Sequence, residues 1–253
     1  MVIIEALIVG LAVGAILGLV GAGGAVLAVP AFLYLFNFTA LQATTASLAV
    51  VAASAAFGAV PRFRLGQVRL RQATLFWLLG LAGTFAGTRI APLIPDPVLI
   101  TGFALVMVGA AITMWRKGSH PEPVGSRSPS LWLTLVVATG IGILAGIFGV
   151  GGGFLIVPAL VLVFGFPFGV AAGTSLVIVA LNSLTALMFR ADTWHDIQWQ
   201  LPLIVIVGGL VGSVIASRAN LAISQRLLER AFAGLLVLLA SWMVIEATVL
   251  RGQ

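Results

Sequence analysis

Apolar runs of about 18 residues or more recur along almost the whole chain and leave only short polar segments between them. Hydrophobic residues make up 61% of the sequence, charged residues make up 8%, and the mean hydropathy is +1.20. Runs of this length cross a bilayer as helices, because a backbone in hydrocarbon must satisfy its hydrogen bonds internally. A membrane barrel would instead show strictly alternating segments of about ten residues, which this sequence lacks. The sequence therefore predicts an all-α polytopic integral membrane protein with no sizeable soluble domain.

The first apolar run and the scarcity of reactive residues narrow the function classes. No basic region or clear cleavage site accompanies the first run, which carries only Glu5, so we expect a retained span rather than a signal peptide. The absence of cysteine excludes disulfides and thiolate chemistry, and two histidines, His120 and His195, are too few for a histidine-rich metal site. We expect no cofactor and no metal. The net charge of +6 indicates cytoplasmic loops rather than nucleic-acid binding.

The two halves of the chain share a sequence pattern. Positions 18–48 align with positions 146–176 without a gap, and 13 of these 31 positions are identical. Several identities are glycine, proline, phenylalanine or serine, which match less easily by chance than leucine or valine in apolar sequence. We expect transmembrane repeats over residues 1–115 and 131–253, joined by a polar cytoplasmic linker over residues 116–130.

Each repeat begins with an apolar stretch interrupted by glycines and continues with three further apolar stretches. If the interrupted stretch forms a hairpin, the chain has about eight spans and each repeat ends on the face opposite its start. The loops after the second stretch differ in charge, which favours opposite faces and hence inverted repeats over parallel ones. The residues of these loops are Arg62, Arg64, Arg69 and Arg71 in the first repeat, and Arg190, Asp192, His195 and Asp196 in the second.

The interruptions are the strongest candidates for a binding site. A glycine run before a helix leaves unpaired backbone amides at the positive end of the helix dipole and lets an anion approach closely. Irregular backbone survives at membrane depth only where it is buried or lines a cavity, and matched broken helices indicate a transporter's midplane site. Close helix packing is the alternative, and we favour it for the pairs Gly14/Gly18, Gly142/Gly146, Gly83/Gly87 and Gly208/Gly212.

A hydroxyl-rich patch follows each interruption, "TTASL" in the first repeat and "GTSL" in the second. Each hydroxyl alone could simply bond to its own helix, but their recurrence beside both interruptions favours a role in binding. Hydroxyl, amide and backbone N–H donors without a carboxylate suit a small oxyanion. The predicted substrate-binding residues are Gly21, Gly23, Gly24, Thr44, Thr45, Ser47, Gly149, Gly151, Gly152, Gly153, Gly173, Thr174, Ser175 and Asn182, with Pro30 and Pro158 as helix-breaking residues.

Two arginines and one histidine have competing interpretations. Arg89 and Arg218 occupy matched positions near span ends, where they either anchor the helix in the interface or form an anion-attracting vestibule. His195 could relay protons, but the neighbouring Trp194 and Trp199 favour an interfacial loop.

The doubled glycine and proline pattern resembles the TauE/SafE family of sulfite and organosulfur exporters over essentially the whole chain. The second repeat is close to the family pattern at Gly149, Gly151, Gly152, Gly153, Pro158, Gly173, Thr174 and Ser175. The first repeat departs from it, because Ala22 and Ala25 flank the glycines and "TTASL" replaces "GTSL". The resemblance implies a cytoplasmic-membrane carrier of small anions with about seven to ten spans.

We therefore expect a secondary transporter that exports sulfite or a related sulfur oxyanion or organosulfonate by alternating access. An anion channel or a non-transporting membrane assembly partner is the alternative. A serine hydrolase is disfavoured because neither histidine lies on a span with a serine. The expected partners are the lipid bilayer and a small anion, and the sequence is compatible with a homo-oligomer.

Overall fold

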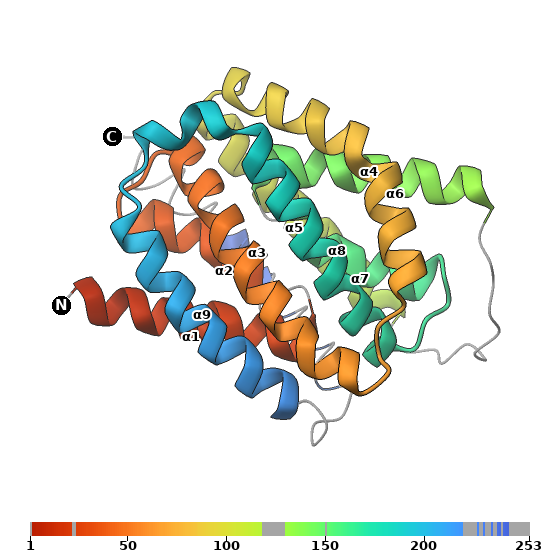
Figure 1. Ribbon diagram of the computed structural model, residues 1–253. Helices are drawn as coiled ribbons and strands as arrows, with labels where there is room; N and C mark the ends of the chain where they lie inside the picture. Colours follow the sequence, from red (N-terminus) through yellow and green to blue (C-terminus); the bar gives the residue numbers. More distant parts are fainter. Residues whose placement is uncertain are drawn as a thin grey trace.

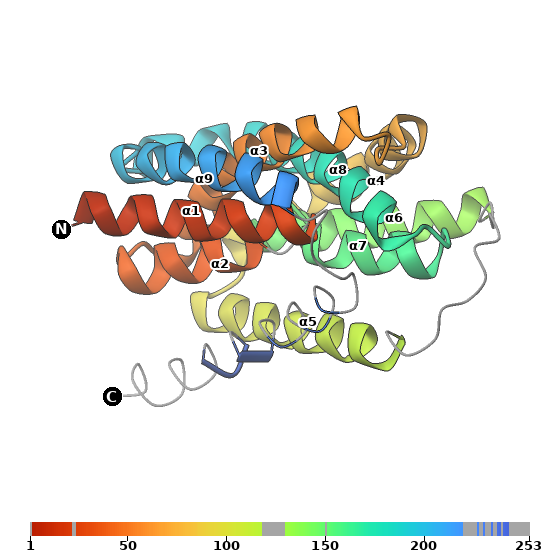
Figure 2. The ribbon, with the colours of Figure 1, turned by 90° about the horizontal axis from the view of Figure 1, so that it is seen from below.

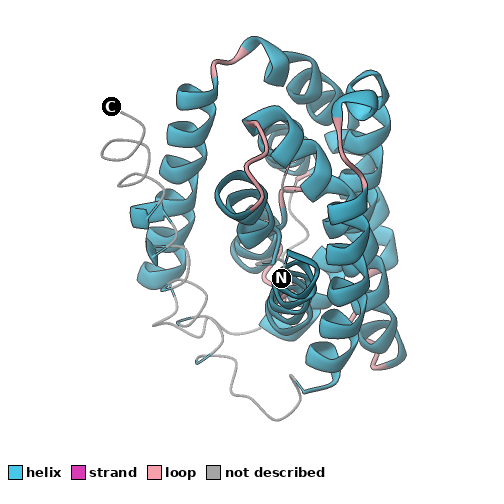
Figure 3. Ribbon diagram, turned by 90° about the vertical axis from the view of Figure 1, so that its left-hand side faces the viewer, coloured by secondary structure: helices cyan, strands magenta, loops and turns pink. Residues whose placement is uncertain are grey.

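The computed structural model describes residues 2–21, 24–117, 130–149 and 151–219, and single positions between 227 and 242. Every regular element of this part of the chain is helical (Figure 3). In chain order the elements are α1 (Val2–Val20), α2 (Gly24–Pro30), the π-helical turn η1 (Ala31–Leu35), α3 (Ala40–Arg64), α4 (Leu70–Ile90), the 3₁₀ turn η2 (Ala91–Leu93), α5 (Asp96–Lys117), α6 (Leu131–Phe148), α7 (Gly153–Leu162), α8 (Phe168–Phe189), the 3₁₀ segment η3 (Ala191–Asp196) and α9 (Gln200–Ala219).

Six of the described helices are long and apolar enough to cross a membrane: α1, α3, α4 with η2, α6, α8 and α9. The all-helical membrane class is thereby confirmed. Two shorter apolar helical stretches, Val26–Leu35 and Asp96–Gly109, add to these six. The expected count of about eight spans and the inverted arrangement stay predictions.

The long helices pair across the two halves of the chain. Helix α1 lies along α9, and α4 lies along α6, as Figures 1 and 2 show. Helices α3 and α8 contact each other at the centre. Within the apolar 18-residue stretch of each helix, 67% of the residues of α3 and 61% of those of α8 are buried, against 33% to 44% in the other four long helices. The central pair is therefore the most buried part of the interface between the halves, to which α1–α9 and α4–α6 also contribute.

Glycines allow the two peripheral pairs to approach closely. A Cβ added to Gly14 would collide with the carbonyl oxygen of Gly209 on α9, and one added to Gly142 would collide with that of Gly80 on α4. Similar collisions occur at Gly18, Gly83, Gly87, Gly146, Gly208 and Gly212. The packing interpretation of these small-residue pairs is confirmed, since contact at this distance excludes any side chain.

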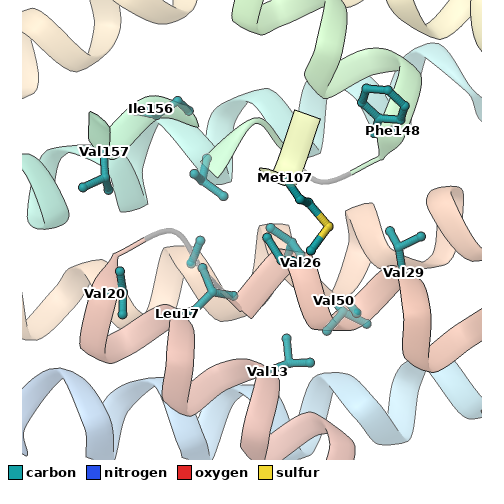
Figure 4. Packing of buried hydrophobic residues seen from close by; sticks show 14 of the residues in the cluster. Val13, Leu17, Val20, Val26, Val29, Val50, Met107, Phe148, Ile156 and Val157 are labelled. Carbon is teal, nitrogen blue, oxygen red and sulfur yellow. The ribbon is translucent and has the colours of Figure 1, made fainter. Parts of the chain in front are cut away.

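The short helices α2 and α7 begin at the glycine interruptions and pack against α3 and α8 respectively. Figure 4 shows the apolar cluster around them, in which Val26 of α2 lies with Leu17 of α1, Met107 of α5 and Ile156 of α7. These side chains are fully buried. The short helices are thus enclosed by protein, which is the condition under which interrupted backbone is tolerated in a membrane.

Candidate functional site

Glycines in the left-handed region of backbone conformation end the first long helix of each half. Gly21 has φ +82° and its N–H donates to the carbonyl of Leu17 at 2.7 Å, while Gly149 has φ +66° and donates to Ala145 at 3.1 Å. This is the single-bond left-handed cap, and only glycine adopts it without strain. The segment Gly21–Gly24 is called the first break, and the segment Gly149–Gly153 is called the second break.

The two breaks differ in how they lead into the next helix. In the second break Gly151 and Gly152 also have positive φ, +64° and +72°, before α7 starts at Gly153. In the first break Gly24 starts α2, and Gly23 lies outside the described residues. The second break thus contains three left-handed glycines, Gly149, Gly151 and Gly152.

The two prolines lie within the helical segments after the breaks. Pro30 is the last residue of α2, and the backbone continues from it as the π-helical turn η1. Pro158 lies inside α7, which runs on to Leu162. The second helix is interrupted at the glycines and not at Pro158, because Gly149, Gly151 and Gly152 have positive φ, whereas the proline ring restricts φ to negative, helix-compatible values.

A serine of each half is hydrogen-bonded to the break of the other half. Ser47 Oγ on α3 lies 2.5 Å from the carbonyl oxygen of Gly149, and Ser175 Oγ on α8 lies 2.7 Å from that of Gly21. The two serines align with each other in the repeat, as do the two glycines, so the two contacts are equivalent with the halves exchanged. Each serine also lies 2.8 Å from a carbonyl of its own helix, so its single hydrogen is shared between this local acceptor and the break. The hydroxyl patch of each half therefore fixes the break of the other.

A buried arginine near the end of α3 caps the carboxyl end of α1. Arg62 is 2% exposed, and its Nη2 donates to the carbonyls of Gly18 and Leu19 at 2.8 and 3.0 Å. Its Nη1 donates to Gln67 Oε1 at 3.2 Å. Carbonyls in the last turn of a helix have no partner within it, and a cation complements the negative end of the helix dipole.

Arg190 plays the same part in the second half, at the position that the repeat aligns with Arg62. It is 1% exposed, and its Nη2 donates to the carbonyls of Gly146 and Ile147 at the end of α6. Its Nη1 donates across the halves to the hydroxyls of Thr44 and Thr45 at 2.9 and 3.1 Å. Thr44 and Thr45, both predicted as site residues, are therefore brought together with a cation.

The charge of Arg190 has no ion-pair partner among the described residues. Burial lowers the pKa of Arg190 to about 10, against an opposing effect of Asp192. The guanidinium remains charged at neutral pH, since this pKa is still well above 7. Sequence reasoning placed Arg62 and Arg190 in loops and missed both, although the alignment that reveals the repeat also pairs them.

Unpaired polar atoms lie beside the second break. A Cβ added to Gly151 would collide with Ser183 Oγ, which is fully buried and has no hydrogen-bond partner in the described part of the chain. The neighbouring Asn182, 2% exposed, has an equally unpaired Oδ1. Because an unpaired buried polar group costs about 1–3 kcal/mol, the Ser183 hydroxyl beside Gly151 favours a polar ligand at the start of α7.

The remaining predicted residues contact other parts of the structure. Thr174 Oγ1 accepts from the backbone N–H of Arg69 at 3.1 Å, and Gly173 closely approaches the backbone of Gln67. The two hydroxyl patches therefore contact different loops. Arg89 and Arg218 are exposed at the ends of α4 and α9, and Arg89 lies 5.4 Å above the Phe85 ring.

A cavity of about 280 Å³ opens where the start of α3 meets η3. Gln42 joins the two elements, because its Nε2 donates to the backbone carbonyl of Asp196 at 2.8 Å and its Oε1 accepts from Thr39 N at 3.1 Å. The lining residues are Thr39, Leu41, Gln42, Thr45, Thr193 and Asp196. The cavity thus combines groups from both halves and reaches Thr45, which is bonded to Arg190.

The chain matches known membrane transporters over most of its length. The family model described as "Sulfite exporter TauE/SafE" matches residues 6–243. A "Probable membrane transporter protein" of Xylella fastidiosa (strain 9a5c) is 35% identical over 242 residues, which cover 92% of this chain and 91% of that protein. The "Probable membrane transporter protein YunE" of Bacillus subtilis (strain 168) is 23% identical over 264 residues, 94% of this chain and 96% of that protein. No solved structure matches the chain.

These matches confirm the resemblance inferred from the doubled glycine and proline pattern. The family is a transporter family and not a class of enzymes. The chain is a multi-pass membrane transporter that belongs to the sulfite exporter TauE/SafE family.

Proposed function

We propose that this transporter exports a small anion, sulfite or a related sulfur oxyanion or organosulfonate, by alternating access around the two breaks. The observation that carries the proposal is the pair of cross-half serine bonds, Ser47 to Gly149 and Ser175 to Gly21. In a carrier with two matched broken helices, the substrate site lies between the halves. A movement of one half against the other changes both breaks together, because each is bonded to the opposite half.

The same contacts support inverted repeats, with residues 1–115 and 131–253 as the two units. An exchange of the halves converts each serine bond into the other, and it also converts the α1–α9 pair into the α6–α4 pair. A twofold axis in the membrane plane accounts for this exchange and for the opposite loop charges. The arrangement has about eight spans, a cytoplasmic linker over residues 116–130 and a location in the cytoplasmic membrane.

The chemistry around the breaks suits an anion. Helices α2, α3, α7 and α8 contain no aspartate or glutamate. The start of α7 presents backbone N–H groups beside the unpaired Ser183 hydroxyl, while Arg62 and Arg190 supply two buried positive charges. Moving one negative charge outward through an inside-negative potential is favourable by about 2.3 kcal/mol per 100 mV, so export needs no titratable group in the spans.

Sulfite efflux from proteoliposomes tests the proposal. Gly152→Leu is expected to abolish transport, because φ +72° strains any side chain there and its Cβ would crowd Ile141. Gly140→Leu is the matched control, since Gly140 is exposed on α6 and a Cβ there meets nothing within 4 Å. Equal sulfite leakage from wild type and Gly152→Leu would refute the proposal.

A second variant separates loss of transport from loss of folding. Ser183→Ala removes a buried hydroxyl without a partner in the described part of the chain, so we expect unchanged or higher thermal stability. If that hydroxyl contacts the substrate, transport falls by about tenfold, the equivalent of one hydrogen bond. Saturation and counterflow support a carrier, whereas single-channel current would identify an anion channel instead.

A further inference from the structure

The cavity between α3 and η3 is lined by residues that carry hydrogen-bond donors and by one acidic residue, Asp196. Its volume, about 280 Å³, accommodates a small oxyanion together with water. Thr39, Gln42 and Thr45 come from the first half, whereas Thr193 and Asp196 come from the second. The cavity is distinct from the breaks, and both halves are needed to form it.

Thr45 is a donor directed away from Arg190. The Nη1 group of Arg190 donates to Thr45 Oγ1 at 3.1 Å, so the hydroxyl accepts from the cation and its own hydrogen points elsewhere. Thr45 lies at the inner wall of the cavity and is 0% exposed, and its hydrogen has no acceptor in the described part of the chain. Because a hydroxyl that accepts from a cation is polarised, Thr45 becomes a stronger donor to an anion.

Asp196 supplies the opposite property, an acceptor with negative charge. Its backbone carbonyl accepts from Gln42 Nε2 at 2.8 Å, which fixes the residue against the start of α3. The charged or titratable groups around it are Arg190 at the end of α8, Asp192 and His195 on η3, and Asp96, whose Oδ2 accepts from Ala40 N at 3.4 Å. A carboxylate accepts a hydrogen bond from an O–H group and repels an oxygen that carries no hydrogen.

We propose that this cavity binds a singly charged oxyanion that carries an O–H group, such as O-protonated sulfite. Thr45, backed by Arg190, donates to the charged oxygens, and Asp196 accepts from the O–H group. Fully deprotonated dianions are rejected, because they would place an oxygen lone pair against the carboxylate. This inference rests on the proposed anion transport and adds to it a second anion site, outside the breaks, that selects the protonation state of the anion.

Two probes of nearly equal shape and equal charge isolate the O–H group. In mildly acidic buffer methylphosphonate is a monoanion with one O–H group, whereas methanesulfonate is a monoanion with none. Calorimetric titration of the purified full chain is expected to show at least about tenfold tighter binding of methylphosphonate, because a hydrogen bond to a charged group contributes about 1.5–3 kcal/mol. A single pH for all titrations keeps the neighbouring titratable groups constant.

Three variants complete the test. Asp196→Asn is expected to bring the affinity ratio of the two probes close to one. Asp192 lies on the same segment and does not line the cavity, so Asp192→Asn is expected to keep the affinity ratio of the wild type. Thr45→Val should weaken both probes alike, because it removes a donor and keeps the shape of the side chain. Equal binding of both probes to the wild type, no binding of either, or an unchanged ratio in Asp196→Asn would overturn the inference.

The outcome is distinguishable from failure of the proposed function. If proteoliposomes do not transport sulfite but the cavity discriminates between the probes, only the transport proposal fails. If sulfite is transported and the wild type binds both probes equally, only the protonation-state inference fails.

Discussion

Replacement of Arg190 by methionine tests whether a single buried cation stabilises the junction of the two halves. Its guanidinium donates to the carbonyls of Gly146 and Ile147 and to the hydroxyls of Thr44 and Thr45. Methionine keeps much of the apolar volume and removes every donor. The carbonyls at the end of α6 then remain buried without a partner.

The magnitude follows from these lost contacts. Two unpaired buried carbonyls cost about 1–3 kcal/mol each, and the absence of a buried cation offsets part of this, because its desolvation penalty is no longer present. We expect a net loss of about 3 kcal/mol in the free energy of unfolding. For a chain of this size each kcal/mol lowers Tm by about 2–4 °C, so the expected decrease is about 10 °C.

Thermal unfolding of the purified protein in detergent measures this effect. Arg64→Met is the matched control, since Arg64 lies at the end of α3 but is exposed, and it should change the free energy of unfolding by less than about 0.5 kcal/mol. Arg190→Lys should fall between the two, because one ammonium group cannot reproduce the fork of guanidinium donors. If Arg190→Met unfolds at the same temperature as Arg64→Met, the capping argument is wrong.

Two further predictions concern the breaks. Ser47→Ala and Ser175→Ala should each lower the free energy of unfolding by about 1 kcal/mol and by similar amounts, because the two bonds are equivalent, and a clear inequality in thermal unfolding would contradict that equivalence. Gly149→Ala should lower the free energy of unfolding several times more than Gly66→Ala. Both glycines have positive φ, which strains an alanine by about 1–2 kcal/mol. A Cβ at Gly149 also collides with the Thr44 backbone, whereas a Cβ at Gly66 meets nothing within 4 Å. Similar stabilities of these two alanine variants, measured in the same way, would show that the close approach to α3 is unimportant.

Much of the fold was predictable from local sequence. The apolar runs predicted the helical membrane class, and the spacing of Gly14 and Gly18 predicted close helix packing, because both depend on composition within one helix. The position of the breaks at Gly21 and Gly149 was also predictable, since left-handed backbone favours glycine wherever it occurs.

The partners of the breaks were not predictable in the same way. Ser47 was expected near the interruption of its own half, but in the structure it bonds to Gly149 in the other half. Arg190 looked like a loop residue beside Trp194, and only its contacts with α6 and α3 reveal it as a buried cation. Ser183 carried no sequence signal that distinguished it from any other serine in an apolar helix.

The sequence by itself determined the class of protein, the repeat and the places where helices must be interrupted, because backbone hydrogen bonding in hydrocarbon and the conformational freedom of glycine are local properties. Only the tertiary structure decided which half completes each break and where the buried charges lie. Contacts such as Ser175 with Gly21 and Arg190 with Thr45 join residues from opposite halves of the chain, and they depend on how whole helices pack rather than on any neighbouring residue.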